Sequence, residues 1–318
     1  MTEKPPENTA KTGLIAAVLA YGWWGALLPV FLIALRGTAP EEVLAHRVLW
    51  SVPFGAAIIA FRSQWPEVVS ALRNLRVVMA LAGSSAMIAI NWLIYIIAVD
   101  NRNLFEAALG YYINPLVYVL VGVVVLREKL SRGKQLAVLL AAIGVTVLTF
   151  YGGKFPAVAL VLAVTFTAYG YLRKQTPVGA MPGLFIETLL LSPFALVYLL
   201  WVDPSKLAFG DGAGITAMLV AAGPVTVFPL LCFAIAARRL SLSTLGFMQF
   251  IGPTLQFVVG LIDGEDFSRP HQICFAFIWT AAAVFALDAI RQGQVRRRER
   301  RERAAGHLEG ERGERRPA

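Results

Sequence analysis

Charged residues are scarce in this chain of 318 residues. Asp, Glu, Lys and Arg make up 15% of the sequence, hydrophobic residues make up 57%, and the mean hydropathy is +0.64. A soluble helical protein needs a polar face on each surface helix, and a segment such as 135–151 has none. The scarcity of charge therefore excludes a soluble globular protein and predicts an integral membrane protein.

Sequence patterns that would indicate catalysis or a cofactor are also missing. Cys232 and Cys274 lie in apolar segments without paired spacing, which argues against a disulfide or a metal site and makes them small core residues. The G-x-x-x-x-G-K-[ST] phosphate loop is absent, because Gly133-Lys134 is followed by Gln135 and lacks the first glycine. The H-E-x-x-H zinc motif and Asp-rich metal motifs are absent too. We expect no cofactor, no metal and no enzymatic activity.

Long apolar segments are what the chain has instead. At about 1.5 Å per residue, roughly 17 to 24 helical residues cross about 30 Å of hydrocarbon. Ten segments meet this condition: 13–35, 43–61, 77–99, 104–126, 135–151, 155–172, 180–202, 214–237, 240–262 and 270–290. The first is too long for a cleaved signal peptide. The sequence therefore predicts an all-α membrane protein with ten transmembrane helices.

The basic residues are distributed unevenly between the two sides of the membrane. Following the chain through ten spans places 23 Lys and Arg on the side of the N-terminus and five on the other side. Cytoplasmic loops carry the basic excess, so we expect both termini in the cytoplasm and the chain in the cell membrane. Residues 1–12 form a cytoplasmic tail, and residues 291–318 form a basic, disordered one. We expect this second tail to rest on anionic lipid rather than bind nucleic acid.

The chain repeats itself weakly at an offset of about 140 residues. Tyr112-Ile113-Asn114-Pro115 is matched 138 positions later by Phe250-Ile251-Gly252-Pro253, and Pro53-Phe54 is matched by Pro193-Phe194 at an offset of 140. Two halves of five spans must enter the membrane from opposite sides, because five is odd. The sequence thus predicts two inverted five-helix repeats, residues 13–151 and 155–290, an organisation typical of secondary transporters.

Polar residues at membrane depth are costly and mark function. Two stripes with a period of four run along the fourth and ninth spans: Glu106, Gly110, Asn114, Tyr118 and Gly122, and Thr244, Met248, Gly252, Gln256 and Gly260. Pro115 and Pro253 lack an N–H, so we expect helix kinks there and freed carbonyls at Tyr111 and Gln249. The alternative to a cavity lined by these stripes is a purely structural one. In it the glycines allow close contact between helices, and the prolines only kink them.

Other polar residues lie in the second, third and seventh spans. Arg47 is six residues before Pro53 and Glu187 is six before Pro193, so the two are counterparts in the repeat. The alternative role of Arg47 and Glu187 is an ion pair or helix cap. His46 is embedded in the membrane, and its alternative to proton coupling is a structural hydrogen bond. We expect substrate binding by Asn91, Trp92, Glu106, Tyr111, Asn114, Tyr118, Gln249 and Gln256, and coupling or gating by His46, Arg47 and Glu187.

Longer stretches of the chain match a known family. They include His46-Arg47-Val48-Leu49-Trp50-Ser51, Asn91-Trp92-Leu93, Glu106 to Leu116, Ile186-Glu187-Thr188, Pro229 to Phe233, Leu242 to Phe247, Ile251 to Leu255 and Phe275 to Trp279. Together they resemble the RarD branch of the EamA family in the drug/metabolite transporter superfamily, over residues 12–290. The resemblance implies ten helices, two inverted halves and a central cavity in the cytoplasmic membrane, in a carrier of amino acids, drugs or metabolites.

One feature of related proteins does not carry over. The small multidrug-resistance relatives exchange protons at a glutamate in their first span, and the span from Gly13 to Leu35 has no acidic residue. The leading hypothesis is a secondary transporter, an exporter of a small organic solute that works by alternating access around a midplane cavity. The alternatives are a membrane scaffold or permease subunit, and an intramembrane enzyme, which would need converging catalytic groups. Both a monomer and a homodimer are left open.

Overall fold

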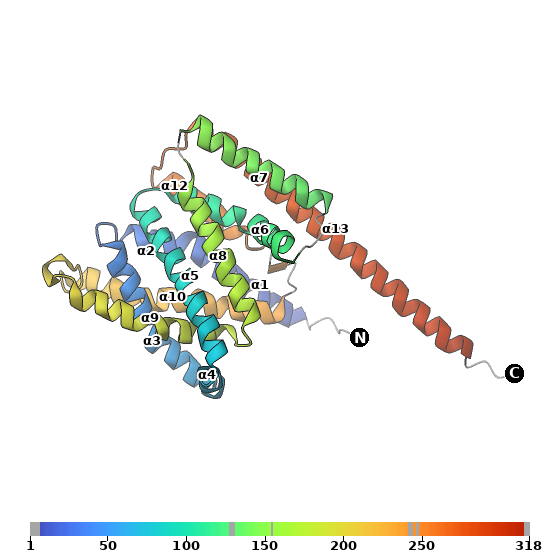
Figure 1. The fold of residues 1–318 in the computed structure, drawn as a ribbon, viewed down its shortest axis with the longest axis horizontal. Coiled ribbons are helices and arrows are strands. Elements are labelled where there is room, and N and C mark those ends of the chain that lie inside the picture. The colour runs from blue at the N-terminus through green and yellow to red at the C-terminus, as the bar shows by residue number, and fades with distance from the viewer. Residues whose placement is uncertain (1–6, 127–130, 154, 241–243, 246–247, 315–318) are drawn as a thin grey trace.

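The computed structural model describes residues 7–126, 131–153, 155–240, 244–245 and 248–314 as a bundle of helices, with no strand among them (Figure 1). In chain order the helices before residue 152 are α1 (Glu7–Gly22), the π-helical η1 (Trp23–Leu27), α2 (Leu28–Ile33), α3 (Pro40–Phe61), α4 (Trp65–Leu72), α5 (Leu75–Asp100), α6 (Leu104–Leu126) and α7 (Arg132–Tyr151). After it come α8 (Ala157–Gln175), α9 (Ala180–Trp201), the short η2 (Pro204–Lys206), α10 (Ala213–Arg239), α12 (Ile251–Ile262) and α13 (Arg269–Glu314).

These helices confirm the prediction of an all-α membrane protein. Within the described ranges, seven helices are long and apolar enough to cross a membrane, and α12 is a shorter apolar helix. The helices α6 and α8 coincide with the fourth and sixth predicted spans. The first predicted span is made by α1, η1 and α2 in succession.

Two elements differ from the expectations. The connection 62–76 contains α4, which starts with Pro66 in its first turn and buries Val68 and Ala71 on one side. The tail expected to be disordered continues α13 as helix through Glu314. Arg, Glu, Gln and Ala are good helix formers, so a helix entering this segment can continue without tertiary packing.

Helices from the two halves of the chain interleave. In the pairs α5 with α8, α6 with α8, α3 with α9 and α3 with α10, a helix before residue 152 packs on one after it. The N-terminal helix α1 packs on α10, and η1 packs on α12. Figure 1 shows α7 running alongside α13 at the edge of the bundle.

Glycines bring these interleaved helices close together. A Cβ built at Gly110 of α6 would lie 2.7 Å from the carbonyl oxygen of Ala159 in α8. A Cβ built at Gly25 of η1 would lie 2.7 Å from the carbonyl oxygen of Gly252 in α12. Any larger residue would push these backbones apart, so the glycines act as close helix contacts between the halves.

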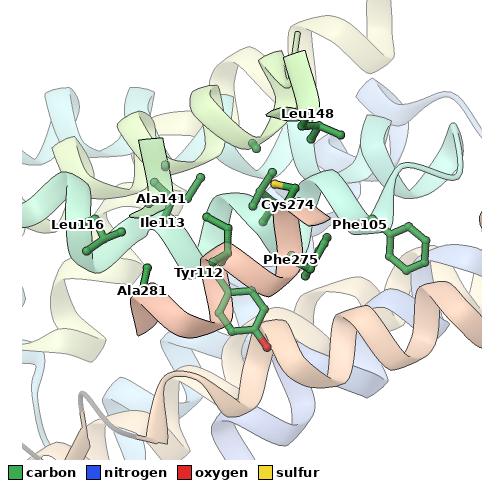
Figure 2. Packing of buried hydrophobic residues seen from close by; sticks show 14 of the residues in the cluster. Phe105, Tyr112, Ile113, Leu116, Ala141, Leu148, Cys274, Phe275 and Ala281 are labelled. Atoms are coloured by element: carbon green, nitrogen blue, oxygen red, sulfur yellow. The ribbon is translucent and has the colours of Figure 1, made fainter. Parts of the chain in front are cut away.

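Apolar side chains fill the remaining space. In the cluster drawn in Figure 2, Tyr112 of α6 lies with its ring centre 6.3 Å from that of Phe275 in α13, and Cys274 is buried beside it. Cys232 and Cys274 are both free and buried, as the sequence predicts. Large apolar residues such as Phe61 and Trp201, 92% and 87% exposed, point away from the bundle, as lipid-facing residues do.

Candidate functional site

Arg47 is the centre of a buried polar cluster. It lies about two turns from the start of α3, and only 3% of it is exposed. Its Nε donates to Thr226 Oγ1 of α10 at 3.0 Å, and its guanidinium carbon lies 4.7 Å from the ring centre of Trp92 in α5. Nη1 is buried and has no hydrogen-bond partner among the described residues. Tyr95 and Tyr111 lie close enough to act on this guanidinium electrostatically, and among the described residues no carboxylate forms an ion pair with it.

Asn91 precedes Trp92 in α5 and connects three helices. Its Nδ2 donates to the Leu162 carbonyl at 3.0 Å and to Thr165 Oγ1 at 2.9 Å, both in α8. Its Oδ1 accepts from the Tyr111 hydroxyl of α6 at 3.3 Å. The amide thus uses its donors and its acceptor within the protein, so in this conformation it positions α5, α6 and α8 rather than offering a free group.

Tyr95 completes this cluster, although the polar pattern of the sequence does not single it out. Its ring centre lies 5.9 Å from that of Tyr111, the residue is 2% exposed, and its hydroxyl has no partner within the described part of the chain. Its position one turn after Asn91 on α5 is the signal that could have identified it. We call Arg47, Asn91, Trp92, Tyr95 and Tyr111 the Arg47 cluster.

Among the described stripe residues, neither Asn114 nor Gln256 is hydrogen-bonded to this cluster. Asn114 is fully buried, and neither its Nδ2 nor its Oδ1 has a partner in the described ranges. Gln256 donates to the Trp24 carbonyl at 3.2 Å, and its Oε1 is buried without a partner among the same residues. Gln249 is partly buried, and Glu106 lies in the first turn of α6. The side chain of Tyr118 lies outside the described residues.

The two prolines behave differently. Pro115 lies inside the continuous helix α6, and the kink expected there stays a prediction. Pro253 lies in the first turn of α12, after turn residues Gln249 and Phe250, so it follows a helix break instead of causing a kink. The first N–H groups of a helix have no partner within that helix, so a proline there removes no hydrogen bond.

His46 lies on another face of α3. Its Nδ1 accepts from Trp50 Nε1 at 3.2 Å, its ring stacks on Phe209 at 4.6 Å, and its Nε2 lies 4.0 Å from Glu42. A cavity of about 340 Å³ opens beside this ring, with an almost wholly apolar lining: His46, Leu49, Trp50, Pro53, Leu199, Leu207 and Phe209. The bond from Trp50 is a structural hydrogen bond of the kind offered as the alternative role for His46, and proton coupling at this residue stays a prediction.

Glu42 is a second residue that the polar pattern of the sequence does not single out. It is fully buried, and its carboxylate accepts the backbone N–H groups of Ala208 and Phe209 at 2.9 and 2.8 Å. Since residue 42 precedes the predicted span 43–61, its burial was not visible in the apolar pattern. The carboxylate holds the connection between α9 and α10 against the start of α3.

Glu187 is fully buried on α9 and has several partners. Ser84 of α5 donates to its Oε1 at 2.5 Å, and the Tyr169 hydroxyl of α8 donates to its Oε2 at 3.4 Å. Arg173 Nε lies 3.5 Å away in an ion pair. Glu187 thus takes part in the ion pair that was its alternative role, and coupling or gating by Glu187 stays a prediction. At the same end of the bundle, here called the Arg173 end, Glu67 of α4 accepts the N–H of Gly179 at 2.6 Å.

The opposite end of the bundle, here called the Arg36 end, is closed by charged groups. Arg36 donates to both oxygens of Asp263 at 2.7 and 2.6 Å and also to the Val99 carbonyl. The hydrogen-bonded Asp263 raises the pKa of Arg36. Glu265 accepts the N–H of Phe105 at the start of α6, and burial raises the pKa of Glu265 to about 7 against the opposing effect of that hydrogen bond.

Metal-binding chemistry is not visible in the described residues. They contain no group of three His, Cys, Asp or Glu side chains placed to hold an ion. The described polar groups of the site are a buried guanidinium, aromatic rings, hydroxyls and amides.

Comparisons with known proteins agree with this fold. Residues 11–150 match the EamA-like transporter family. The chain is 42% identical over 300 residues to an uncharacterized transporter of Vibrio cholerae, covering 93% of this chain and 99% of that protein. It is 41% identical to Protein RarD of Escherichia coli over 283 residues, covering 88% of this chain and 95% of that one.

A more distant relative and a solved structure extend the comparison. The chain is 30% identical to the chloramphenicol-sensitive protein RarD of Pseudomonas aeruginosa, covering 83% of this chain and 90% of that protein. A crystal structure of a protein 20% identical in sequence superposes with a TM-score of 0.59, covering 90% of this chain and 99% of the other, and supports the fold alone. The chain therefore belongs to the EamA-like transporter family as a RarD-like, multi-pass membrane protein.

Proposed function

We propose that this chain is a secondary transporter that exports a small organic solute by alternating access between two inverted five-helix halves. The observation that carries the proposal is the Arg47 cluster, which takes polar groups from α3, α5 and α6 of the first half and joins them to α8 and α10 of the second. Polar groups at membrane depth between two repeats are typical of a transport site. Three relatives are named as transporters, which supports the same class for this chain. The proposed function includes no enzymatic activity.

The contacts at the two ends of the bundle support the proposed mechanism. At the Arg36 end, Arg36 and Glu42 of the first half hold Asp263 and the 208–209 connection of the second. At the Arg173 end, Glu67 and Ser84 of the first half hold Gly179 and Glu187 of the second. Alternating access requires one set of contacts to break while the other holds.

The proposal includes the membrane in which the chain lies and its orientation there. The 23-to-5 distribution of basic residues supports a cell-membrane protein with both termini in the cytoplasm and the basic tail on anionic lipid. Single cysteines introduced at positions 74 and 131 test this orientation. Labelling of either position by an impermeant reagent from outside would reverse it.

Transport by the purified full chain in liposomes tests the function. The panel contains amino acids, chloramphenicol and related drugs, and central metabolites, each with and without a pH gradient. Asn114→Leu and Gln249→Leu keep approximate size and delete hydrogen-bonding groups. If these amides bind solute while the carrier cycles, each change raises the KM by about 2- to 10-fold, the effect of one lost hydrogen bond to a neutral group.

Asn101→Leu is the matched control, because Asn101 is an exposed amide at the end of α5. Its insertion and kinetics should equal those of the wild type. Saturable transport by none of the panel would favour the scaffold alternative. Wild-type kinetics in both amide variants would leave the stripe as helix packing and confine the site to the Arg47 cluster.

A further inference from the structure

Arg47 is the one charge in the described interior whose surroundings leave it uncompensated. The two other charged side chains that are fully buried are carboxylates, and both have partners. Glu42 accepts hydrogen bonds from two backbone N–H groups. Glu187 accepts hydrogen bonds from two hydroxyls and forms an ion pair with Arg173. Arg47 has the Thr226 hydroxyl and the face of Trp92. A ring face attracts a cation but accepts no hydrogen bond from Nη1.

This arrangement does not serve stability. A buried guanidinium without a carboxylate carries its full desolvation penalty, and proteins usually neutralise such a group with an acid. Thr226 does not need Arg47, because its hydroxyl also donates to the Ala222 carbonyl at 2.8 Å. A second group next to Arg47 is similarly unsatisfied, since the Tyr95 hydroxyl is buried without a partner among the described residues.

We propose that Arg47 binds the anionic group of the transported solute, and that the solute is a small organic acid with an apolar or aromatic body. A carboxylate matches the planar donors of a guanidinium and supplies the missing countercharge. Tyr95 donates to the same carboxylate, while Trp92 and Tyr111 contact the apolar body. The inference rests on the proposed transport function, since it specifies the solute of that same site.

Binding by the purified, full-length protein tests the assignment. The probes are sodium acetate, benzoate and phenylacetate, each compared with its uncharged amide at equal ionic strength and pH 7. Binding is followed by tryptophan fluorescence and by the shift in Tm. The wild type should bind the acids at least about 10-fold more tightly than the amides, because a charge-assisted, bidentate contact is stronger than a neutral one.

Arg47→Met deletes the charge and keeps an apolar side chain of similar length against Trp92. We expect it to lose the preference for acids and to have a Tm equal to or above that of the empty wild type. Arg173→Met is the matched control, because Arg173 is paired with Glu187, so its loss should lower the Tm. An arginine with a purely structural role would give Arg47→Met the same lowered Tm.

Two milder variants keep the test decisive if Arg47→Met does not fold. Arg47→Lys keeps the charge and loses the planar pair of donors, so the acid preference should fall but persist. Tyr95→Phe deletes only the unpartnered hydroxyl and should weaken acid binding several-fold without lowering the Tm.

The results separate this inference from the transport proposal. Equal binding of acids and amides by the wild type, or an acid preference retained in Arg47→Met, overturns the role of Arg47. If such a protein still transports neutral solutes in liposomes, the proposed function survives. Acid-selective binding that disappears in Arg47→Met upholds the role of Arg47 even where the liposomes show no transport.

Discussion

Arg47 and Glu187 are matching positions in the two predicted repeats, and they have opposite surroundings. Each lies six residues before a proline inside its helix, in α3 and α9, which pack on each other. Glu187 has two hydroxyl donors and an arginine within 3.5 Å, whereas Arg47 has one hydrogen bond and an unpartnered Nη1 in the described region. Both positions therefore carry a buried charge, and the neighbouring helices decide whether that charge is paired within the fold or lacks part of its partners among the described residues.

The strongest test of this comparison is Glu187→Leu. The change leaves Arg173 without its carboxylate and the Ser84 hydroxyl without its acceptor. Breaking a buried pair usually costs 3–5 kcal/mol, and Arg173 is partly exposed, so we expect the free energy of unfolding to fall by about 3 kcal/mol. Chemical unfolding in detergent measures this loss.

Glu187→Gln serves as the control for that experiment. Its amide oxygen still accepts from Ser84, so the loss should be smaller. A loss below about 1 kcal/mol in Glu187→Leu would contradict a structural ion pair. The same Gln variant tests energy coupling: if Glu187 carries a proton, gradient-driven transport should vanish while solute exchange persists.

A smaller effect is expected at the Arg36 end. Arg36 and Asp263 form a bidentate ion pair in which the side chains are 19% and 12% exposed. We expect Arg36→Gln to lower the free energy of unfolding by about 1–2 kcal/mol, because charge-assisted pairs of this geometry exceed ordinary surface pairs. A double-mutant cycle with Asp263→Asn measures the coupling. A coupling energy near zero would show that Arg36 acts through the Val99 carbonyl instead.

The smallest effect is a pH dependence at the same end. The pKa of Glu265 is raised from 4.5 to about 7 by burial, so the unfolded chain releases this proton at lower pH than the folded chain. Between pH 4.5 and 7 the folded state binds more protons, and stability therefore falls as the pH rises through this window. With allowance for partial exposure to solvent, the loss is about 1 kcal/mol.

Glu265→Gln is expected to remove this part of the pH dependence. The amide oxygen can still accept the N–H of Phe105, so the start of α6 keeps its cap. Thermal unfolding of both proteins between pH 5 and 8 makes the comparison. Parallel curves for the two proteins would show that the carboxyl titrates at its ordinary pKa.

The helices could be predicted from the sequence because each span depends on its own apolar run. Asn91, Trp92 and Tyr111 were each selected from the sequence as polar or aromatic residues at membrane depth, but their contact with one another was not predicted. Glu42 was not predicted, because its role depends on a contact with Ala208, which is far away in the sequence. Tyr95 was not predicted, because its role depends on the position of the Tyr111 ring in the next helix. The stripe periodicity identified Asn114 and Gln256 as buried, but it could not distinguish them from the cluster that contains Arg47.

The two carboxylates that hold a backbone at opposite ends of the bundle have a consequence for how this sequence can change. Glu42 accepts the N–H groups of residues 208 and 209, and Glu67 accepts that of residue 179. Every amino acid except proline supplies such a donor. At residues 208 and 209 these hydrogen bonds place no demand on the side chains and constrain only Glu42. At residue 179 the contact also favours glycine, because a Cβ built there would lie 2.9 Å from Glu67 Oε1 and would displace that carboxylate.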